Sequence, residues 1–266
     1  MKNVIIIPCY NEAGRFKFDD FQQFINAHST YAICFVNDGS KDETLAQLQN
    51  FAKDQENRIK IYDMPKNGGK AEAVRSGMNY MMENHKIETI GFIDADLATG
   101  FKDYKILVNT LIDKDQKMVF GSRKMESEGD IDRSLFRKLA STLIGVMIKI
   151  IIGLPVKDSQ CGAKVFQVPT AKYVFRKSFM SRWLFDVEMF IRIKNIFDET
   201  TMNYIKEVAV TNWEEVEGSH ITFSDSLKFP KELLEIGYTY NVKPVFQQIA
   251  KPQAATIRRL IFRRAA

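Results

Sequence analysis

The chain has 266 residues, 45% of them apolar, which fits one globular domain and excludes a disordered chain or two large domains. Its 38 Lys and Arg residues outnumber its 33 Asp and Glu residues, for a net charge of +5. The whole excess lies in residues 251–266, which contain five basic residues and no acid. Nucleic-acid-binding proteins usually carry their basic residues on a folded face. This distribution therefore argues against a nucleic-acid partner and favours an anionic partner or a membrane surface.

The cysteines and the first residues predict a reduced, cytoplasmic protein. Cys9, Cys34 and Cys161 are an odd number without the spacing of a metal site. The opening MKNVIIIPCYNE lacks the basic segment, apolar run and cleavage site of a secretory signal. Residues 139–156 are almost wholly apolar, but a spanning helix needs about 20 such residues, and Lys149 lies near the middle. We therefore expect a buried or interfacial helix there, in a protein peripherally associated with the inner face of the membrane.

Short apolar runs alternate with amphipathic segments through the first half of the chain. The runs that predict strands are 4–7, 33–36, 59–62, 89–93 and 118–120. The segments that predict helices are 16–27, 42–52, 70–82 and 102–112. This alternation is typical of an α/β protein with a mostly parallel central sheet flanked by helices. Each predicted strand ends in polar or small residues, and ligands of such sheets bind beyond the carboxyl ends of the strands.

The second half of the chain is less regular. It predicts a long apolar helix from about residue 134, a polar loop at 157–162 and a helix that starts near Phe185. A strand near 204–213 and further helices after Ser224 follow. We therefore divide the chain into a main domain, residues 1–240, and a C-terminal helical extension with a basic tail, residues 241–266.

Two acids, Asp94 and Asp96, follow one apolar run in the sequence Gly-Phe-Ile-Asp-Ala-Asp-Leu. Carboxylates two residues apart at a strand end can bind one divalent cation, which in turn neutralises a diphosphate. The alternative is that one acid caps the following helix and the other is solvated, since short motifs often occur by chance. The residues at the other strand ends therefore bear on this choice.

The first two strand ends carry polar residues in place of a glycine-rich dinucleotide turn. Residues 8–12, Pro-Cys-Tyr-Asn-Glu, contain no G-x-G-x-x-G motif, which argues against a nicotinamide or flavin cofactor. Asp38 lies in the Asn-Asp-Gly-Ser turn after the second strand. It is a candidate to hold a base or a ribose, or else it is an ordinary turn acid.

A glycine turn at 66–70 opens the helix that carries Arg75. The segment lacks the residues that a P-loop requires at two positions. Backbone N–H groups at a helix N-terminus and the charges of Lys70 and Arg75 nevertheless suit a phosphate group. Taken singly, both cations would more often be solvated charges on a helix.

These segments and several later ones occur in the order found in family 2 glycosyltransferases with the GT-A fold, which the chain resembles over roughly residues 3–240. The last three segments resemble the branch that contains the dolichyl-phosphate β-glucosyltransferases and their polyprenyl-phosphate relatives. The matching segments are Pro8-x-Tyr10-Asn11-Glu12, Asn37-Asp38-Gly39-Ser40, Asn67-x-Gly69-Lys70, Asp94-Ala95-Asp96, Gly121-Ser122-Arg123, Asp158-Ser159-Gln160-Cys161-Gly162-Ala163-Lys164, Arg182-Trp183-x-Phe185-Asp186-Val187-Glu188 and Trp213-x-Glu215-x-Glu217-Gly218-Ser219.

The resemblance implies a nucleotide-sugar donor such as UDP-glucose. A Mg²⁺ or Mn²⁺ ion held by Asp94 and Asp96 would bridge the phosphate oxygens, so that UDP leaves as a metal-stabilised anion. The residues that the resemblance places near the base and ribose are Pro8, Tyr10, Glu12 and Asp38, and those near the diphosphate are Lys70 and Arg75.

The resemblance also implies an inverting reaction, in which the acceptor attacks the anomeric carbon from the face opposite UDP. A lipid phosphate is already ionised at neutral pH, so a strong general base is less necessary than positive side chains that hold it. Arg123 and Arg137 match positions expected to do so. The catalytic candidates are therefore Asp96, Arg123, Asp158 and Asp186.

The roles of three acids stay open at this point. Asp158 either orients the acceptor region or acts as a base toward a hydroxyl acceptor. Asp186 and Glu188 either belong to the site or mark the start of a helix with a salt bridge to Arg182.

We interpret the chain as a metal-dependent inverting glycosyltransferase that moves a hexose, expected to be glucose, from a UDP-sugar to a polyprenyl phosphate at the membrane surface. One alternative keeps the fold but transfers the sugar to a hydroxyl group of a cell-surface glycan or glycolipid. Another is a non-catalytic sugar-nucleotide binder or scaffold, against which the paired acids at 94 and 96 speak. The helix after residue 134 and the basic segment 257–264 would supply the membrane contact, unless the first is a core helix and the second is solvated.

Overall fold

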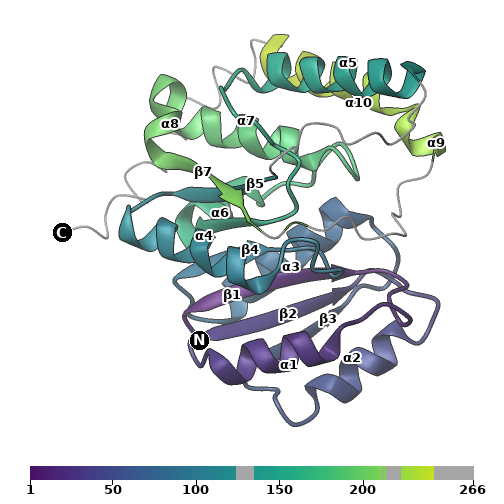
Figure 1. Cartoon of the computed structure of the whole chain (residues 1–266), viewed down its shortest axis with the longest axis vertical. Coiled ribbons are helices and arrows are strands. Elements are labelled where there is room, and N and C mark those ends of the chain that lie inside the picture. Colours follow the sequence, from purple (N-terminus) through teal and green to yellow (C-terminus); the bar gives the residue numbers. More distant parts are fainter. Residues whose placement is uncertain (124–134, 212, 214–222, 243–266) are drawn as a thin grey trace.

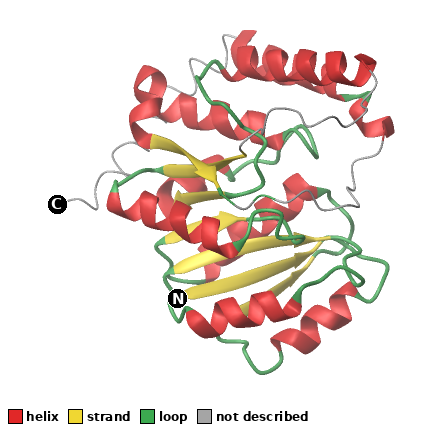
Figure 2. Ribbon diagram, in the orientation of Figure 1, coloured by secondary structure: helices red, strands yellow, loops and turns green. Residues whose placement is uncertain are grey.

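Seven strands form one sheet in the order β3-β2-β1-β4-β6-β5-β7, with helices packed on both faces (Figures 1 and 2). The computed structural model describes residues 1–123, 135–211, 213 and 223–242. The strands are β1 (Asn3–Cys9), β2 (Tyr31–Asn37), β3 (Ile59–Asp63), β4 (Thr89–Phe92), β5 (Met118–Arg123), β6 (Lys164–Gln167) and β7 (Ile205–Val210). This arrangement confirms the predicted α/β fold with a mostly parallel central sheet.

The four helices that connect the first five strands confirm the predicted alternation. They are α1 (Phe18–Ala27), α2 (Thr44–Ala52), α3 (Lys70–Asn84) and α4 (Phe101–Asp113). The helices of the second half are α5 (Leu135–Ile152), α6 (Val168–Val174), α7 (Phe185–Phe197), α8 (Thr201–Tyr204), α9 (Phe223–Ser226) and α10 (Phe229–Gly237), with short 3₁₀ and π turns η1 (Asp198–Thr200) and η2 (Tyr238–Val242).

The sheet is buried on both faces, which explains why its strands are continuous apolar runs. In β1, Val4 and Ile6 point into a core formed with α3, α6 and α7, whereas Ile5 and Ile7 point into a core formed with α1, α2 and α4. A Cβ atom on Gly77 of α3 would lie 2.5 Å from the Val36 side chain, so the helix packs closely on the sheet. Because β1 pairs in parallel with β2 and β4, and β2 pairs in parallel with β3, the carboxyl ends of these four strands lie at one common edge of the sheet.

The sequence analysis missed β6 and the helix α6 that follows it. β6 is antiparallel to both of its neighbours, with Ile90 opposite Phe166 and Phe120 opposite Lys164. The strand has only four residues, one of them a buried lysine, and its pairing joins segments far apart in the chain. Local patterning carries little signal for such a strand, because its partners rather than its own residues stabilise it.

The predicted apolar helix is α5, which lies with α10 in an outer layer at the top of Figure 1. Its residues Ile148 and Ile152 are buried in the core, but Ile150 is 72% exposed, so one face is packed and the other is not. Among the described residues, none of the helices combines the length and the hydropathy that crossing a bilayer requires. The basic tail, residues 251–266, and the segment 257–264 within it lie outside the described residues.

Candidate active site

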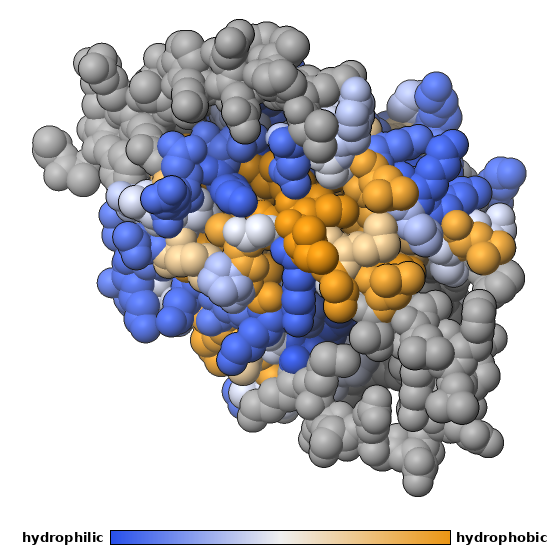
Figure 3. All heavy atoms as spheres, turned by 90° about the horizontal axis from the view of Figure 1, so that it is seen from above, coloured by the Kyte–Doolittle hydropathy of each residue, from blue (hydrophilic) through white to orange (hydrophobic). Residues whose placement is uncertain are grey.

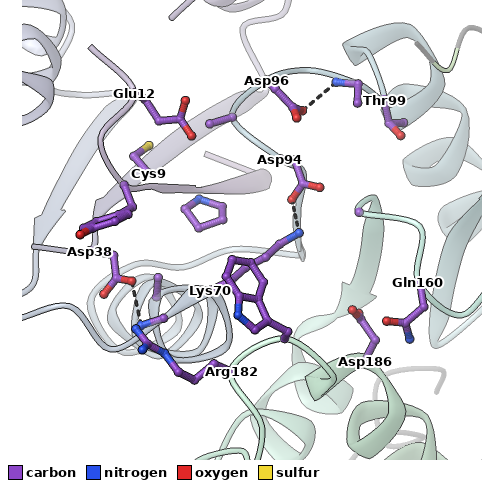
Figure 4. A pocket seen from close by; sticks show the side chains of 18 of the residues that line it. Cys9, Glu12, Asp38, Lys70, Asp94, Asp96, Thr99, Gln160, Arg182 and Asp186 are labelled. Carbon is purple, nitrogen blue, oxygen red and sulfur yellow. Dashed lines mark hydrogen bonds and ion pairs between the residues drawn. The ribbon is translucent and has the colours of Figure 1, made fainter. Parts of the chain in front are cut away.

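A cavity of about 600 Å³ lies beyond the carboxyl ends of β1, β2, β4 and β5 (Figure 4). It contains most of the residues that the sequence analysis selected. The lining includes Pro8, Tyr10, Glu12, Asp38, Lys70, Asp94, Asp96, Arg123 and Asp186, together with Arg15, Asn67, Thr99, Gln160, Gly162, Arg182, Trp183, Trp213 and Asp225.

The loop after β1 is tied to the loop after β2. The Asn11 backbone N–H donates to Ser40 Oγ at 3.0 Å, and the Glu12 backbone N–H donates to Thr44 Oγ1 at 2.7 Å. Glu12 is buried and pairs with Arg15 at 2.9 Å. The two loops therefore form one polar wall of the cavity.

Asp38 organises the glycine turn in front of α3. Its carboxylate accepts hydrogen bonds from the backbone N–H groups of Gly68 at 2.6 Å and Gly69 at 2.8 Å. Burial raises the pKa of Asp38, and these two hydrogen bonds oppose that shift. Gly69 has φ +87°, a conformation that favours glycine, and a Cβ atom there would overlap the Arg182 side chain. Asp38 thus shapes the start of the helix that carries Lys70.

Lys70 extends from the first turn of α3 toward the strand end that carries the paired acids (Figure 4). Its Nζ lies 2.5 Å from Asp94 Oδ1. Burial works against the charged form of Lys70, but the carboxylates of Asp94, Asp186 and Asp96 outweigh it and raise the lysine pKa. The site therefore keeps a cation beside Asp94.

Asp94 and Asp96 both line the cavity, and their chain turns sharply between β4 and α4. Leu97, the next residue, has φ +56°, and the Ala98 backbone N–H donates to Asp96 Oδ1 at 2.9 Å. Opposite them, a Cβ atom on Gly162 would overlap the Asp94 carboxylate. The glycine therefore lets the loop before β6 approach the acid closely.

The donor set suits a divalent cation whose remaining ligands come from a bound phosphate and water. Two carboxylates two residues apart match the few protein ligands that Mg²⁺ usually takes in phosphate sites. No cluster of three or more His, Cys, Asp or Glu side chains able to hold a metal occurs among the described residues. Asp94 and Asp96 are thus the residues that could hold a cation, and a bound phosphate and water would complete its coordination.

Arg123, at the end of β5, is clamped by Asp158. Its Nε and Nη2 donate to the two carboxylate oxygens at 2.7 and 2.9 Å, and its backbone N–H donates to Oδ2 at 3.1 Å. Burial opposes the charge of Asp158, but the hydrogen bonds and charge of Arg123 outweigh it and lower the pKa of Asp158. The Arg123 guanidinium also lies 5.6 Å from the centre of the Trp213 ring. Arg123 lines the cavity, whereas Asp158 is outside its lining.

Asp186 begins α7 and pairs with a lysine that the sequence analysis gave no role. Lys164 Nζ lies 2.8 Å from Asp186 Oδ1 and donates to the Cys161 carbonyl at 2.5 Å, and the lysine side chain is fully buried. Burial raises the pKa of Asp186, and the ammonium of Lys164 opposes that shift. The considered salt bridge to Arg182 is replaced by ion pairs of Asp186 with Lys164 and of Glu188 with Arg192.

Arg182 and Trp183 are cavity residues that the sequence analysis quoted in a motif without assigning them a function. The Arg182 carbonyl accepts a hydrogen bond from the Ala71 N–H at 3.1 Å, and its guanidinium donates to Asn67 Oδ1. The segment before α7 therefore closes over the glycine turn of α3. Their place in a motif was the available signal, but only the fold brings this segment to the cavity, beside Asn67 and the start of α3.

Two described candidates, Arg75 and Asp158, are outside the cavity lining. Arg75 lies one turn along α3, where its guanidinium donates to the Glu72 carboxylate at 2.5 and 2.8 Å, and it is outside the cavity lining. The side chain of Arg137 lies outside the described residues, as do Glu215, Glu217, Gly218 and Ser219 of the last motif.

A mostly parallel sheet with paired acids, a lysine and an arginine around one cavity at the strand ends is the arrangement of a GT-A glycosyltransferase. The model of the family described as glycosyl transferase family 2 matches residues 4–183. The chain belongs to this family.

Two similar proteins from distant organisms share one name. The chain is 31% identical over 252 residues to a dolichyl-phosphate beta-glucosyltransferase of Dictyostelium discoideum, covering 89% of this chain and 74% of that protein. It is 31% identical over 255 residues to the human protein of the same name, covering 89% and 75%. The expected branch of the family is thereby confirmed.

A solved structure shows the same fold at low sequence identity. Glucosyl-3-phosphoglycerate synthase from Mycobacterium tuberculosis, in complex with Mn²⁺, uridine-diphosphate and phosphoglyceric acid, has a TM-score of 0.65 and 14% identity. The match covers 89% of this chain and 78% of that one. The predicted GT-A fold is thus confirmed.

Proposed function

We propose that this chain is an inverting glucosyltransferase that transfers glucose from UDP-glucose to a polyprenyl phosphate of the dolichyl type at a membrane surface. The observation that carries the proposal is that Lys70, Asp94 and Asp96 line the same cavity as Arg123. Two phosphate-bearing substrates would therefore have charged partners in one site. The named relatives, which are dolichyl-phosphate beta-glucosyltransferases, support the choice of sugar and acceptor.

The donor half of the site would be formed by the loops after β1 and β2 and by the start of α3. Pro8, Tyr10, Glu12 and Asp38 line the side on which the base and ribose would lie. Lys70 and the N-terminus of α3 would face the diphosphate, because both favour negative charge. Arg75 would act on the donor only at longer range, since Glu72 already holds its guanidinium.

Asp94 and Asp96 would hold Mg²⁺ or Mn²⁺. The ion would supply the positive charge that stabilises UDP as a leaving group. Lys70 pairs with Asp94 at 2.5 Å, and it would turn from the acid to the phosphate oxygens when the donor binds. The solved relative's complex with Mn²⁺ and uridine-diphosphate supports a divalent ion in this fold.

The acceptor phosphate would meet Arg123. A phosphate oxygen is ionised at neutral pH and can attack the anomeric carbon without a strong base. Asp158 then serves to orient Arg123, because both of its oxygens accept hydrogen bonds from that arginine and its pKa is lowered. Asp186 lines the same cavity and would help to fix the acceptor side, held in place by Lys164.

The test is a panel of radiolabelled UDP-sugars incubated with the purified protein and a membrane lipid extract. We expect UDP-glucose to give a labelled product that partitions into organic solvent and is labile to mild acid. Transfer only to water-soluble or hydroxyl acceptors would contradict the lipid-phosphate acceptor and favour the glycan alternative.

The metal assignment has its own test. An Asp94→Ala, Asp96→Ala double variant should lose the divalent-metal-dependent release of UDP by at least about a hundredfold, since each good electrostatic contact to the leaving group contributes about 2–4 kcal/mol. The matched control is Asp113→Ala at the end of α4, outside the cavity lining. UDP release by the double variant at the wild-type rate would overturn the assignment.

A further inference from the structure

The exposed face of α5 is apolar. Leu143, Val146 and Ile150 follow helical spacing along it and are 59%, 48% and 72% exposed. The opposite face of the helix is packed, with Ile148 and Ile152 in the core. Ile148 and Ile152 already hold α5 on the core, so the exposed stripe is not needed to pack the helix against the described residues.

A second apolar stripe lies on α10 and at its two ends: Leu227 is in the turn before the helix, Leu234 is within it, and Tyr238 follows it in η2. Leu227, Leu234 and Tyr238 are spaced by seven and four residues and are 67%, 64% and 54% exposed. α10 packs directly on α5, since a Cβ atom on Gly237 would lie 3.3 Å from the Ile151 side chain. Asn241 also donates a hydrogen bond to the Ile151 carbonyl at 2.9 Å. Seen from above, hydrophobic residues gather on this face of the molecule (Figure 3).

We call these six side chains the apolar plate: Leu143, Val146, Ile150, Leu227, Leu234 and Tyr238. Scattered apolar side chains on a surface are ordinary, but six exposed ones carried by two helices that pack on each other, and by the residues at the ends of α10, are typical of an interaction surface. The chemistry of its surroundings then indicates the partner.

Basic residues accompany the plate. The stretch 135–157 contains four basic residues and no acid, and Lys149 in it is exposed next to the α5 stripe. Lys231 is 81% exposed and lies on the α10 stripe itself, between Leu227 and Leu234. The acids of α10 are engaged locally, Glu235 with Lys231 and Glu232 with Ser181. An apolar helix face flanked by lysines suits the headgroup region of an anionic bilayer, where the lysines reach the phosphates.

The same charges disfavour two other occupants. In a dimer with two-fold symmetry, the lysine-flanked face of one copy would pack against the same face of the other copy. The chain's own tail, residues 251–266, is also basic, with five basic residues and no acid. Like charges at close range are unfavourable in both cases.

The plate is connected to the cavity. On the inner side of α10, Glu232 Oε2 accepts a hydrogen bond from Ser181 Oγ at 2.6 Å. Ser181 Oγ in turn accepts from the backbone N–H groups of Trp183 at 3.2 Å and Leu184 at 2.9 Å. Trp183 lines the cavity. The hydrogen bonds of Ser181 therefore connect Glu232 of α10 to a residue of the cavity lining.

We propose that the apolar plate of α5 and α10 docks this protein on an anionic lipid bilayer. The proposal rests on the proposed function for its purpose, because a polyprenyl phosphate is confined to a bilayer. Its physical basis, an apolar face with lysines around it, is independent of the sugar and of the acceptor.

The experiment is flotation of the full chain with vesicles of phosphatidylcholine, with and without phosphatidylglycerol. We expect binding to the anionic vesicles, and we expect the Ile150→Glu, Leu234→Glu double variant to bind them at least about tenfold more weakly, as expected when buried aliphatic side chains are lost. The matched control is Ile112→Glu on α4, a 53% exposed side chain outside the plate, which should bind like the wild type. Circular dichroism and binding of UDP in solution would check that each variant is folded.

Three outcomes would overturn the proposal. One is equal flotation of the double variant and the wild type, and another is equal binding to neutral and anionic vesicles. The third is a wild-type dimer in sedimentation experiments that the double variant dissociates, which would assign the plate to a second copy of the chain. The flotation experiment contains no sugar donor, so a failure to bind vesicles would leave the glucosyltransferase proposal intact. Vesicle binding by a protein that transfers no glucose would contradict the glucosyltransferase proposal and leave the docking proposal intact.

Discussion

We propose Arg123 as the cation that meets an acceptor phosphate, because it lines the cavity while Asp158 holds its guanidinium with two hydrogen bonds. Replacing Arg123 by Met removes the charge that would meet the phosphate and leaves the half-buried Asp158 carboxylate without its guanidinium partner. Asp158→Asn keeps the arginine charge and weakens only its orientation. For a phosphate acceptor we therefore expect Arg123→Met to lower kcat/KM by about a hundredfold or more, and Asp158→Asn by less.

The measurement is kcat/KM for the lipid acceptor at saturating UDP-glucose, with the dissociation constant of UDP as a control for the donor side. UDP binding should change little in either variant. If Asp158→Asn abolished transfer while Arg123→Met retained it, Asp158 would be a general base and the acceptor would be a hydroxyl group.

Lys164 and Asp186 form a buried ion pair at 2.8 Å, in which Asp186 lines the cavity. Removing one partner of such a pair leaves an uncompensated buried charge, at a cost of about 3–5 kcal/mol. We expect Lys164→Met to lower the free energy of unfolding by roughly this amount and Lys164→Met, Asp186→Asn to regain much of it. Urea unfolding of both single variants and the double variant measures the coupling. Additive losses would mean that the two side chains do not stabilise each other.

The cavity residues at the strand ends could be selected from the sequence, and the partners of Arg123 and Asp186 could not. Asp94 and Asp96 follow a strand, and such strand ends meet at one edge of a parallel sheet. Lys164 looks like an ordinary lysine in a short segment, because its partner Asp186 is distant in the sequence and reaches it only through the fold. Asp158 was a candidate, but its clamp on Arg123 depends on side-chain geometry that spacing does not encode.

At the scale of elements, β6 is the feature that local patterning failed to predict. The alternation of apolar runs and helices predicted the parallel strands correctly, since each carries its own β-strand signal. β6 enters between β4 and β5 in the antiparallel direction. Its entry brings the loop that contains Cys161 and Gly162 against Asp94, so this missed strand completes the site.

Gly162 tests that arrangement directly. Alanine at this position would place a Cβ atom on the Asp94 carboxylate, so either the loop or the acid must move. We expect Gly162→Ala to weaken metal-dependent UDP binding by about tenfold or more, consistent with a loss of at least 1.4 kcal/mol at a displaced charged ligand. Gly14→Ala is the matched control, because an added Cβ atom there meets nothing within 4 Å. Calorimetric titration with UDP and Mn²⁺ measures the effect, and unchanged binding would show that Asp94 can shift freely.

At the scale of the whole molecule, charge and apolar surface are distributed unevenly. Residues 1–250 are balanced, and the net charge of +5 comes from residues 251–266. The apolar plate lies on the outer layer formed by α5 and α10. We therefore expect two physically different contributions to membrane binding, a hydrophobic one from the plate and an electrostatic one from the tail.

Salt concentration separates these contributions. Each basic residue near an anionic surface contributes about 1 kcal/mol, and this attraction is screened beyond about 8 Å at physiological ionic strength. We expect deletion of residues 251–266 to weaken vesicle binding at low salt by about tenfold or more and to flatten its salt dependence. Binding at high salt, which the plate would dominate, should change far less, because burial of apolar surface is not screened.

Flotation of the full and truncated chains over a range of salt concentrations measures this, with UDP binding as the control for an intact donor site. UDP binding should be unchanged, since every donor-side candidate lies within residues 1–96. Equal vesicle binding by both chains at every salt concentration would show that the tail is only solvated. The plate would then account for all of the attachment, and the charge of the tail would have no part in it.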